Sequence, residues 1–245
     1  MVWGFLTPAH IISLVAGVGI IIGMYFALRN LSEKAKIIIL GILSFSGIAA
    51  IIFNLLMWNS PLEYLPLHLC SLNALVLPIA VFTRNKTLNN LLLLWSFWAL
   101  FSLLVNVSVA DAKIFDPVFC FFYFPHVLEL GIPILMFVLK LVKKDVKCIV
   151  STIVITFSTY TLIHFINLWI NNYTATNNIL DWSGNVIKVN YMFSITPENP
   201  LLALFYSIIP FEYWYMYLAV IPIAIYLGFV YLKDIIKLVH NRRTK

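Results

Sequence analysis

Long apolar windows alternate with short polar segments along the whole chain. The windows lie at 8–29, 36–58, 66–82, 88–109, 125–142, 147–170 and 208–232. A helix needs about 20 such residues to cross a hydrocarbon core roughly 30 Å thick. The pattern predicts an all-α, polytopic transmembrane helix bundle of about seven spans. Windows 66–82 and 125–142 lie near the lower limit of length for a full crossing.

The basic residues predict the topology of these spans, because Lys and Arg are retained on the cytoplasmic side of inserted helices. If the N-terminus is outside, 14 of the 16 basic residues fall in one set of loops. They are Arg29, Lys34, Lys36, Arg84, Lys86, Lys140, Lys143, Lys144, Lys147, Lys233, Lys237, Arg242, Arg243 and Lys245. We therefore expect an outer N-terminus and a cytoplasmic C-terminus. The net charge of +6 follows from the same bias, so no nucleic-acid partner is expected.

The amino-acid composition is that of a membrane protein and gives no sign of a second domain. Apolar residues make up 62% of the 245 and charged residues 11%, against about 45–50% and about 25% in soluble domains. We expect one integral membrane domain over residues 1–245. The three cysteines are scattered without a C-x-x-C pair, so neither a disulfide framework nor a thiolate metal site is expected. No metal and no cofactor is predicted.

One stretch, residues 171–200, departs from the apolar pattern. It is rich in Asn and Thr and lies outside by the predicted topology. The turn residues Ser183-Gly184-Asn185 between two apolar runs predict a short hairpin. A loop of this length is more often functional or disordered than a plain connector.

Four of the five histidines share the outer third of the predicted membrane: His10, His68, His126 and His164. A proline precedes three of them, in Thr7-Pro8, Leu65-Pro66 and Phe124-Pro125. Each pair predicts a helix start, because the first helical position tolerates proline's missing N–H. A histidine in the first turn is favoured as neutral imidazole, the form that a general base or metal ligand needs. For His10 we prefer the simpler interpretation of a wetted interfacial ring.

The remaining polar groups in these windows complete a candidate site. Glu129 lies three residues after His126, on the same helix face, where its carboxylate would orient the ring. In a helix that starts at Pro66, His68 and Cys70 point to nearly opposite sides, whereas Cys70 shares its face with Asn73. A base for Cys70 must then come from another helix, and His126 has the right depth. The alternative is that Cys70 is a small packing residue. Asn73 and His164 are candidate substrate-binding residues.

Several short motifs resemble a known family. They are Pro66-Leu67-His68-Leu69-Cys70, Pro125-His126, Asn190-Tyr191-Met192 and Asn199-Pro200-Leu201-Leu202 before a Trp/Tyr-rich last span. This set resembles the bacterial YwaF-like integral membrane proteins, which are similar to the animal transmembrane protein 164 family.

The resemblance implies a multi-pass protein of the bacterial cell membrane with six or seven helices. It also implies acyl transfer between membrane phospholipids without acyl-CoA, by an intramembrane cysteine and histidine. In the animal pattern the cysteine immediately precedes the histidine, whereas here Leu67 holds that place. His68 and His126 therefore match more closely than the nucleophile does. Asn190 and Tyr191 become candidate substrate-binding residues.

Three hypotheses follow. The first is a phospholipid acyltransferase or lipid hydrolase at the outer leaflet, with His68, Cys70, His126 and Glu129 as catalytic residues. The second is a transport protein or a metal- or haem-binding protein that uses the outer histidines. The third is a scaffold for an envelope complex. The oligomeric state stays open.

Overall fold

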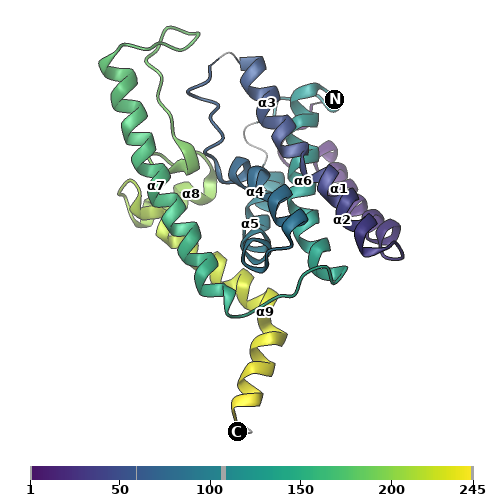
Figure 1. Ribbon diagram of the computed structural model, residues 1–245. Coiled ribbons are helices and arrows are strands. Elements are labelled where there is room, and N and C mark those ends of the chain that lie inside the picture. Colours follow the sequence, from purple (N-terminus) through teal and green to yellow (C-terminus); the bar gives the residue numbers. More distant parts are fainter. Residues whose placement is uncertain (1, 59, 106–108, 244–245) are drawn as a thin grey trace. The chain divides into compact units, whose positions relative to one another are not determined.

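The computed structural model describes residues 2–58, 60–105 and 109–243, with side chains to Lys237 (Figure 1). Residues 106–108 of window 88–109 and the basic side chains after Lys237 lie outside this part. The α-helices are α1 Pro8–Leu28, α2 Glu33–Ser44, α3 Ser46–Trp58, α4 Leu69–Thr83, α5 Lys86–Val105, α6 Pro117–Val138, α7 Cys148–Thr176, α8 Pro200–Ile208 and α9 Val220–Arg243. Short 3-10 helices are η2 Tyr191–Phe193 and η3 Trp214–Ala219.

These helices confirm an all-α fold, and their number is compatible with about seven spans. In the described residues, six segments are long and apolar enough to cross a membrane, and α2 with α3 forms one of them. The seventh, α4, has 15 residues and reaches about 22 Å. It corresponds to window 66–82, whose full crossing the sequence left open.

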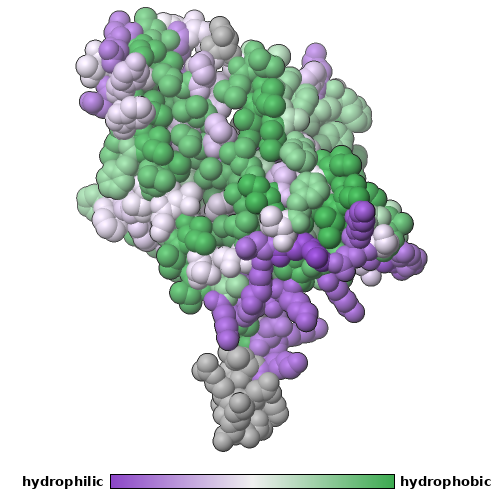
Figure 2. All heavy atoms as spheres, in the orientation of Figure 1, coloured by the Kyte–Doolittle hydropathy of each residue, from purple (hydrophilic) through white to green (hydrophobic). Residues whose placement is uncertain are grey.

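The surface of the molecule also fits a bilayer. Figure 2 shows apolar side chains over most of the visible face. Val15 of α1, Phe165 of α7 and Phe229 of α9 are 68%, 62% and 82% exposed. Rows of large apolar side chains on span-length helices are the faces that lipid covers.

Two of the three predicted helix starts are wrong. Thr7-Pro8 does begin α1, where the Thr7 hydroxyl accepts from the His10 N–H at 3.2 Å. Helix α4 instead begins at Leu69, so His68 lies just before it. Helix α6 begins at Pro117 behind Asp116, which places Pro125 and His126 in its interior. An earlier Asp-Pro start was available, and transmembrane helices tolerate interior proline.

The chain forms two compact units. Unit 1 comprises Met1–Phe53 and Leu69–Asp145, and unit 2 comprises Asn54–His68 and Val146–Lys245. In unit 1, α5 packs against both α4 and α6, and about half of its residues are buried. This core carries the first part of the candidate site.

The expectation that His10 is a wetted ring is wrong. Its side chain is fully buried in unit 1. The Leu6 N–H donates to Nδ1 at 3.0 Å, and Nε2 lies 2.8 Å from the Leu103 carbonyl, to which it donates. The Trp3 ring meets the imidazole edge-on at 5.3 Å. Because the segment before α1 folds over the ring, both nitrogens are used within the protein.

In unit 2, α7 continues to Thr176, so the predicted loop 171–200 begins later than expected. The predicted hairpin forms as a single bridge between Leu180 and Val186 around a turn at Asp181–Gly184. From there the chain returns beside α7 in extended form (Figure 1). We call residues 187–191 the strap.

Three side chains of α7 pair with the strap backbone. Thr174 Oγ1 donates to the Ile187 carbonyl at 2.7 Å. Asn171 donates to the Val189 carbonyl at 2.9 Å and accepts its N–H at 2.7 Å. Asn167 does the same for Tyr191, at 2.8 and 3.0 Å. Between Asn167 and Asn171 four helical residues rise about 6 Å, close to the roughly 6.6 Å of the two extended residues that separate Tyr191 from Val189, so these two pairs stay in register.

Candidate functional site

The eight predicted site residues divide between the two units. Cys70, Asn73, His126 and Glu129 belong to unit 1, whereas His68, His164, Asn190 and Tyr191 belong to unit 2. Each group is therefore described by itself. We call the first group the unit 1 cluster and the second the unit 2 network, which also includes Asn167 and Ser194.

The unit 1 cluster forms where three helices meet. Glu129 on α6 is only 3% exposed. A methyl group built on Gly47 of α3 would lie 2.9 Å from Glu129 Oε1 and 2.5 Å from Cβ of Ala74 on α4. A side chain on Gly47 would therefore clash with both neighbours, and glycine allows this close approach.

Cys70 and Asn73 occupy one face of α4, one turn apart. Cys70 is partly buried and lies within electrostatic range of Glu129. Asn73 is 1% exposed, and neither its side-chain nitrogen nor its oxygen has a hydrogen-bond partner in the described residues. Glu129 Oε2 is equally buried and unpartnered there. The face shared by Cys70 and Asn73 agrees with the prediction.

The imidazole of His126 is fixed by its own helix. Its Nδ1 lies 2.7 Å from the Phe122 carbonyl, and the two rings stack at 4.2 Å. A carbonyl oxygen only accepts, so Nδ1 carries the hydrogen. In the neutral ring this leaves Nε2 as the basic nitrogen. The Phe122 carbonyl, rather than the expected Glu129, is the partner of Nδ1.

In unit 1, α4 thus carries a thiol and a buried amide without a partner in the described residues, and α6 carries an imidazole with a basic Nε2 and a buried carboxyl group. Burying an amide without a partner costs about 1–3 kcal/mol, and folded proteins rarely accept this cost. Asn73 and Glu129 therefore suit a polar group that comes from outside the chain.

In unit 2, His68 has the opposite tautomer. The Met192 backbone N–H donates to its Nδ1 at 3.3 Å. The neutral ring must then carry its hydrogen on Nε2 and present that nitrogen as a donor. The rings of Tyr191 and Phe193 pack on the imidazole, with centroids 5.2 and 5.4 Å away.

Two members of the unit 2 network, Asn167 and Ser194, were not among the predicted site residues. Asn167 is fully buried and donates to Ser194 Oγ at 2.9 Å, in addition to its bonds with Tyr191. Ser194 Oγ in turn lies 3.0 Å from His164 Nδ1. A signal for Asn167 existed, because His164, Asn167, Asn171 and Thr174 form a polar stripe at helical spacing. The pattern around Ser194 carries no such signal.

Asn190 and Tyr191 are bonded within unit 2. The Asn190 amide donates to the Thr196 carbonyl at 2.9 Å and accepts the Ile195 N–H at 2.9 Å. Tyr191 is 1% exposed, and its hydroxyl donates to the Leu62 carbonyl. Both side chains hold the segment that contacts His68.

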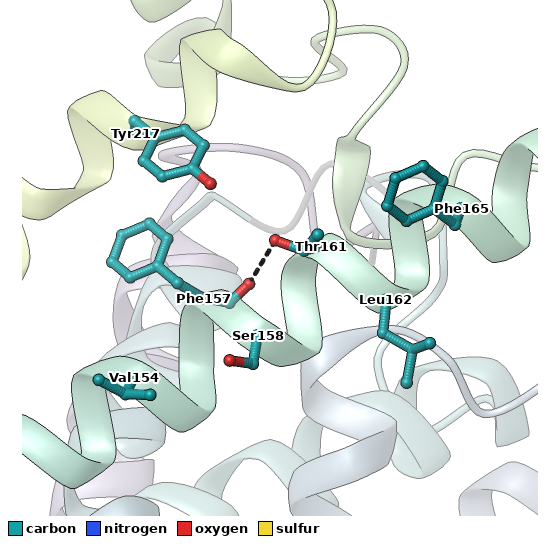
Figure 3. A pocket seen from close by; sticks show the side chains of 7 residues that line it. All are labelled: Val154, Phe157, Ser158, Thr161, Leu162, Phe165 and Tyr217. Atoms are coloured by element: carbon teal, nitrogen blue, oxygen red, sulfur yellow. Dashed lines mark hydrogen bonds between the residues drawn. The ribbon is translucent and has the colours of Figure 1, made fainter.

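The described residues contain no group of three or more His, Cys, Asp or Glu side chains that could hold a metal. A shallow groove runs along α7, lined by Val154, Phe157, Ser158, Thr161, Leu162, Phe165 and Tyr217 (Figure 3). The Thr161 hydroxyl donates to the Phe157 carbonyl at 2.9 Å, and the Tyr217 hydroxyl points toward it. The residues that line the groove include none of the predicted site residues.

Comparison with known proteins identifies the family. The profile of the TMEM164 family matches residues 5–232, almost the whole chain. The chain therefore belongs to the TMEM164 family. The match confirms the expected relationship to transmembrane protein 164 and, with the apolar helices, a multi-pass membrane protein. No curated protein and no solved structure matches the chain.

Proposed function

We propose that this TMEM164 family protein is a phospholipid acyltransferase or lipid hydrolase, embedded in a bacterial cell membrane and acting at the outer leaflet. The observation that carries the proposal is the buried amide of Asn73, which has no hydrogen-bond partner in the described residues and lies on the same face of α4 as Cys70. An ester group that enters the cluster would provide the missing hydrogen-bond partners. Membrane phospholipids are the proposed substrates.

In the first half-reaction, Cys70 Sγ attacks the ester carbonyl carbon, and the thiol proton passes to Nε2 of His126. The oxyanion that forms accepts a hydrogen bond from the Asn73 amide. The bond to the alkoxy oxygen then breaks, and His126 returns the proton to that oxygen. The products are a thioester on Cys70 and a lysolipid.

In the second half-reaction, a lipid hydroxyl group or water attacks the thioester carbonyl. His126 Nε2 takes the attacking proton and returns it to the departing thiolate of Cys70. An acceptor hydroxyl gives a new lipid ester, whereas water gives a free fatty acid. The buried carboxyl group of Glu129 contributes polarity next to Cys70.

We assign His68 the role of a hydrogen-bond donor to the substrate, because its Nδ1 is already used as an acceptor. A neutral ring of this tautomer donates from Nε2. His164, Asn190 and Tyr191 are proposed substrate-binding residues, through the segment that they hold. Loop residues 177–199 are proposed to limit the access of water, which favours transfer over hydrolysis.

Labelling with a thiol-directed phospholipid analogue tests the nucleophile, with the acyl-enzyme detected by mass spectrometry. We expect Cys70→Ala to abolish labelling and Cys120→Ala, a partly buried cysteine on α6, to retain it. Unchanged labelling of Cys70→Ala would remove Cys70 from the mechanism. If Cys70→Ala still turns over lipid while His126→Ala is inactive, a hydroxyl group or water is the nucleophile.

A further inference from the structure

The tautomer of His68 depends on one backbone N–H. The Met192 N–H reaches Nδ1 because the chain at Met192 and Phe193 adopts φ values of 53° and 54°. Two consecutive residues other than glycine rarely occupy this left-handed region, because it is strained for residues with a side chain. The surrounding structure must hold such a turn in place.

Asn167 holds the turn from both sides. It pairs with both backbone groups of Tyr191, the residue before the turn. Its amide nitrogen also donates to Ser194 Oγ, immediately after the turn. Asn167 and Ser194 are both fully buried, so water does not compete for these bonds. One side chain therefore brackets the two strained residues.

Other contacts also hold this segment: the Phe193 N–H donates to the Asn190 carbonyl at 3.0 Å, which closes the turn around Tyr191 and Met192. The Tyr215 hydroxyl donates to the Phe193 carbonyl, and the Tyr213 N–H donates to the Ser194 carbonyl at 2.8 Å. Neither bond involves Tyr191 or the N–H that His68 accepts. The peptide group that carries the Met192 N–H begins at Tyr191, whose N–H and carbonyl both pair with the Asn167 side chain.

We propose that Asn167 is the positioning residue of His68. By pairing with Tyr191 and Ser194, it keeps the Met192 N–H on Nδ1 and so keeps the hydrogen of the neutral imidazole on Nε2. The inference rests on the proposed function in so far as His68 acts on substrate. The assignment of the tautomer is independent of turnover.

The chain provides a matched control one helical turn away. Asn171 pairs with both backbone groups of Val189, as Asn167 pairs with those of Tyr191. Asn171→Leu and Asn167→Leu therefore each remove two bonds to the strap backbone, and Asn167→Leu also removes the bond to Ser194 Oγ. Only Asn167→Leu releases the segment next to His68, so the two variants separate positioning from general destabilisation.

The test is nitrogen NMR of the full chain in lipid nanodiscs, with ¹⁵N-labelled histidine and a His68→Ala spectrum to assign the signals. At a pH where the ring is neutral, we expect wild type and Asn171→Leu to show hydrogen on Nε2 alone. Asn167→Leu should show a mixture of both tautomers. Asn167→Asp, which keeps only the bond from the Tyr191 N–H, should lie between them and guards against a Leu variant that does not fold.

Turnover of a phospholipid should follow the tautomer. Because only part of the His68 population then donates from Nε2 to the substrate, we expect turnover to fall about tenfold in Asn167→Leu and to stay close to wild type in Asn171→Leu. A wild-type tautomer in both Asn167 variants, or an equal mixture in Asn171→Leu, would overturn the positioning role. If the tautomer shifts in the Asn167 variants but the wild-type protein turns over no lipid, the proposed function is wrong and the positioning role of Asn167 still holds.

Discussion

Asn73 in unit 1 and Asn167 in unit 2 are the same residue type in similar burial, 1% and 0% exposed, with opposite surroundings. Both atoms of the Asn73 amide lack a partner in the described residues, whereas both atoms of Asn167 are bonded. A bonded amide contributes to folding, and an unbonded one costs stability. Asn167 thus belongs to a framework that the protein completes by itself, whereas we propose that a ligand completes the hydrogen bonds of Asn73.

The largest expected effect comes from replacing each asparagine by leucine. Asn167→Leu leaves the N–H and carbonyl of Tyr191 without their partner, so the free energy of unfolding should fall by about 2–4 kcal/mol. Asn73→Leu removes an unsatisfied group, so the change should lie within about 1 kcal/mol of zero or be stabilising. Denaturation in mixed micelles measures both.

Lipid turnover sharpens this prediction, because Asn73→Leu should lower the rate about 100-fold as an oxyanion donor is lost. Stability kept with activity lost is the expected signature of a ligand site. If Asn73→Leu destabilises the protein as much as Asn167→Leu does, the amide is structural and the contrast between the units fails.

A smaller effect is expected at the meeting point of α3, α4 and α6. Gly47→Ala forces the new methyl group against Ala74 and Glu129, so we expect a loss of about 1–3 kcal/mol and reduced labelling of Cys70. Gly19→Ala on α1 is the control, since no atom lies within 4 Å of the added methyl group. It should be neutral or stabilise by about 0.5 kcal/mol. Equal losses at both positions would show that close packing at Gly47 is unimportant.

The smallest effect concerns the turn that begins the strap. Asp181 Oδ1 accepts from the N–H groups of Ser183 and Asn185 at 2.8 and 2.9 Å, which lowers the pKa of the carboxyl group. The ionised carboxylate therefore stabilises the turn at any pH above the unfolded-state pKa of about 3.9. This stabilisation is lost as the pH falls through the lower pKa of the folded state. Fluorescence anisotropy of Trp182, 88% exposed, should therefore drop in that acidic range.

Asp181→Asn retains the accepting oxygen but does not titrate, so its anisotropy should not change with pH there. A pH-dependent drop of the same size in Asp181→Asn would place the responsible group elsewhere.

Local sequence patterns predicted the helices well and their beginnings unevenly. The cap Thr7 with Pro8 was sufficient for α1, because both act within one turn. At Pro125 the local signal pointed to a helix start, yet α6 had already begun at Pro117. A proline lacks an N–H wherever it lies, so its presence in the sequence does not tell whether the residues before it are already helical.

The candidate site was predictable as a set of residue types and not as an arrangement. The spacing of Cys70 with Asn73 and of His126 with Glu129 follows from the helical repeat, so these faces were foreseeable. The Phe122 carbonyl as the partner of His126 was not foreseeable. Within one helical turn of His126, both this backbone carbonyl and the Glu129 carboxylate could accept the ring N–H, and the sequence does not say which one does.

The sequence by itself determined the apolar spans, the sign of the loop charges and the polar stripe on α7, because these depend on hydrophobicity and the 3.6-residue repeat. Tertiary structure decided which polar groups found partners. His10 became a fully bonded core residue, Asn167 paired with a strap 24 residues away, and Asn73 found no partner among the residues that the structure describes. The physical reason is that a buried hydrogen bond needs two groups from distant segments at one point, and no local pattern contains that distance.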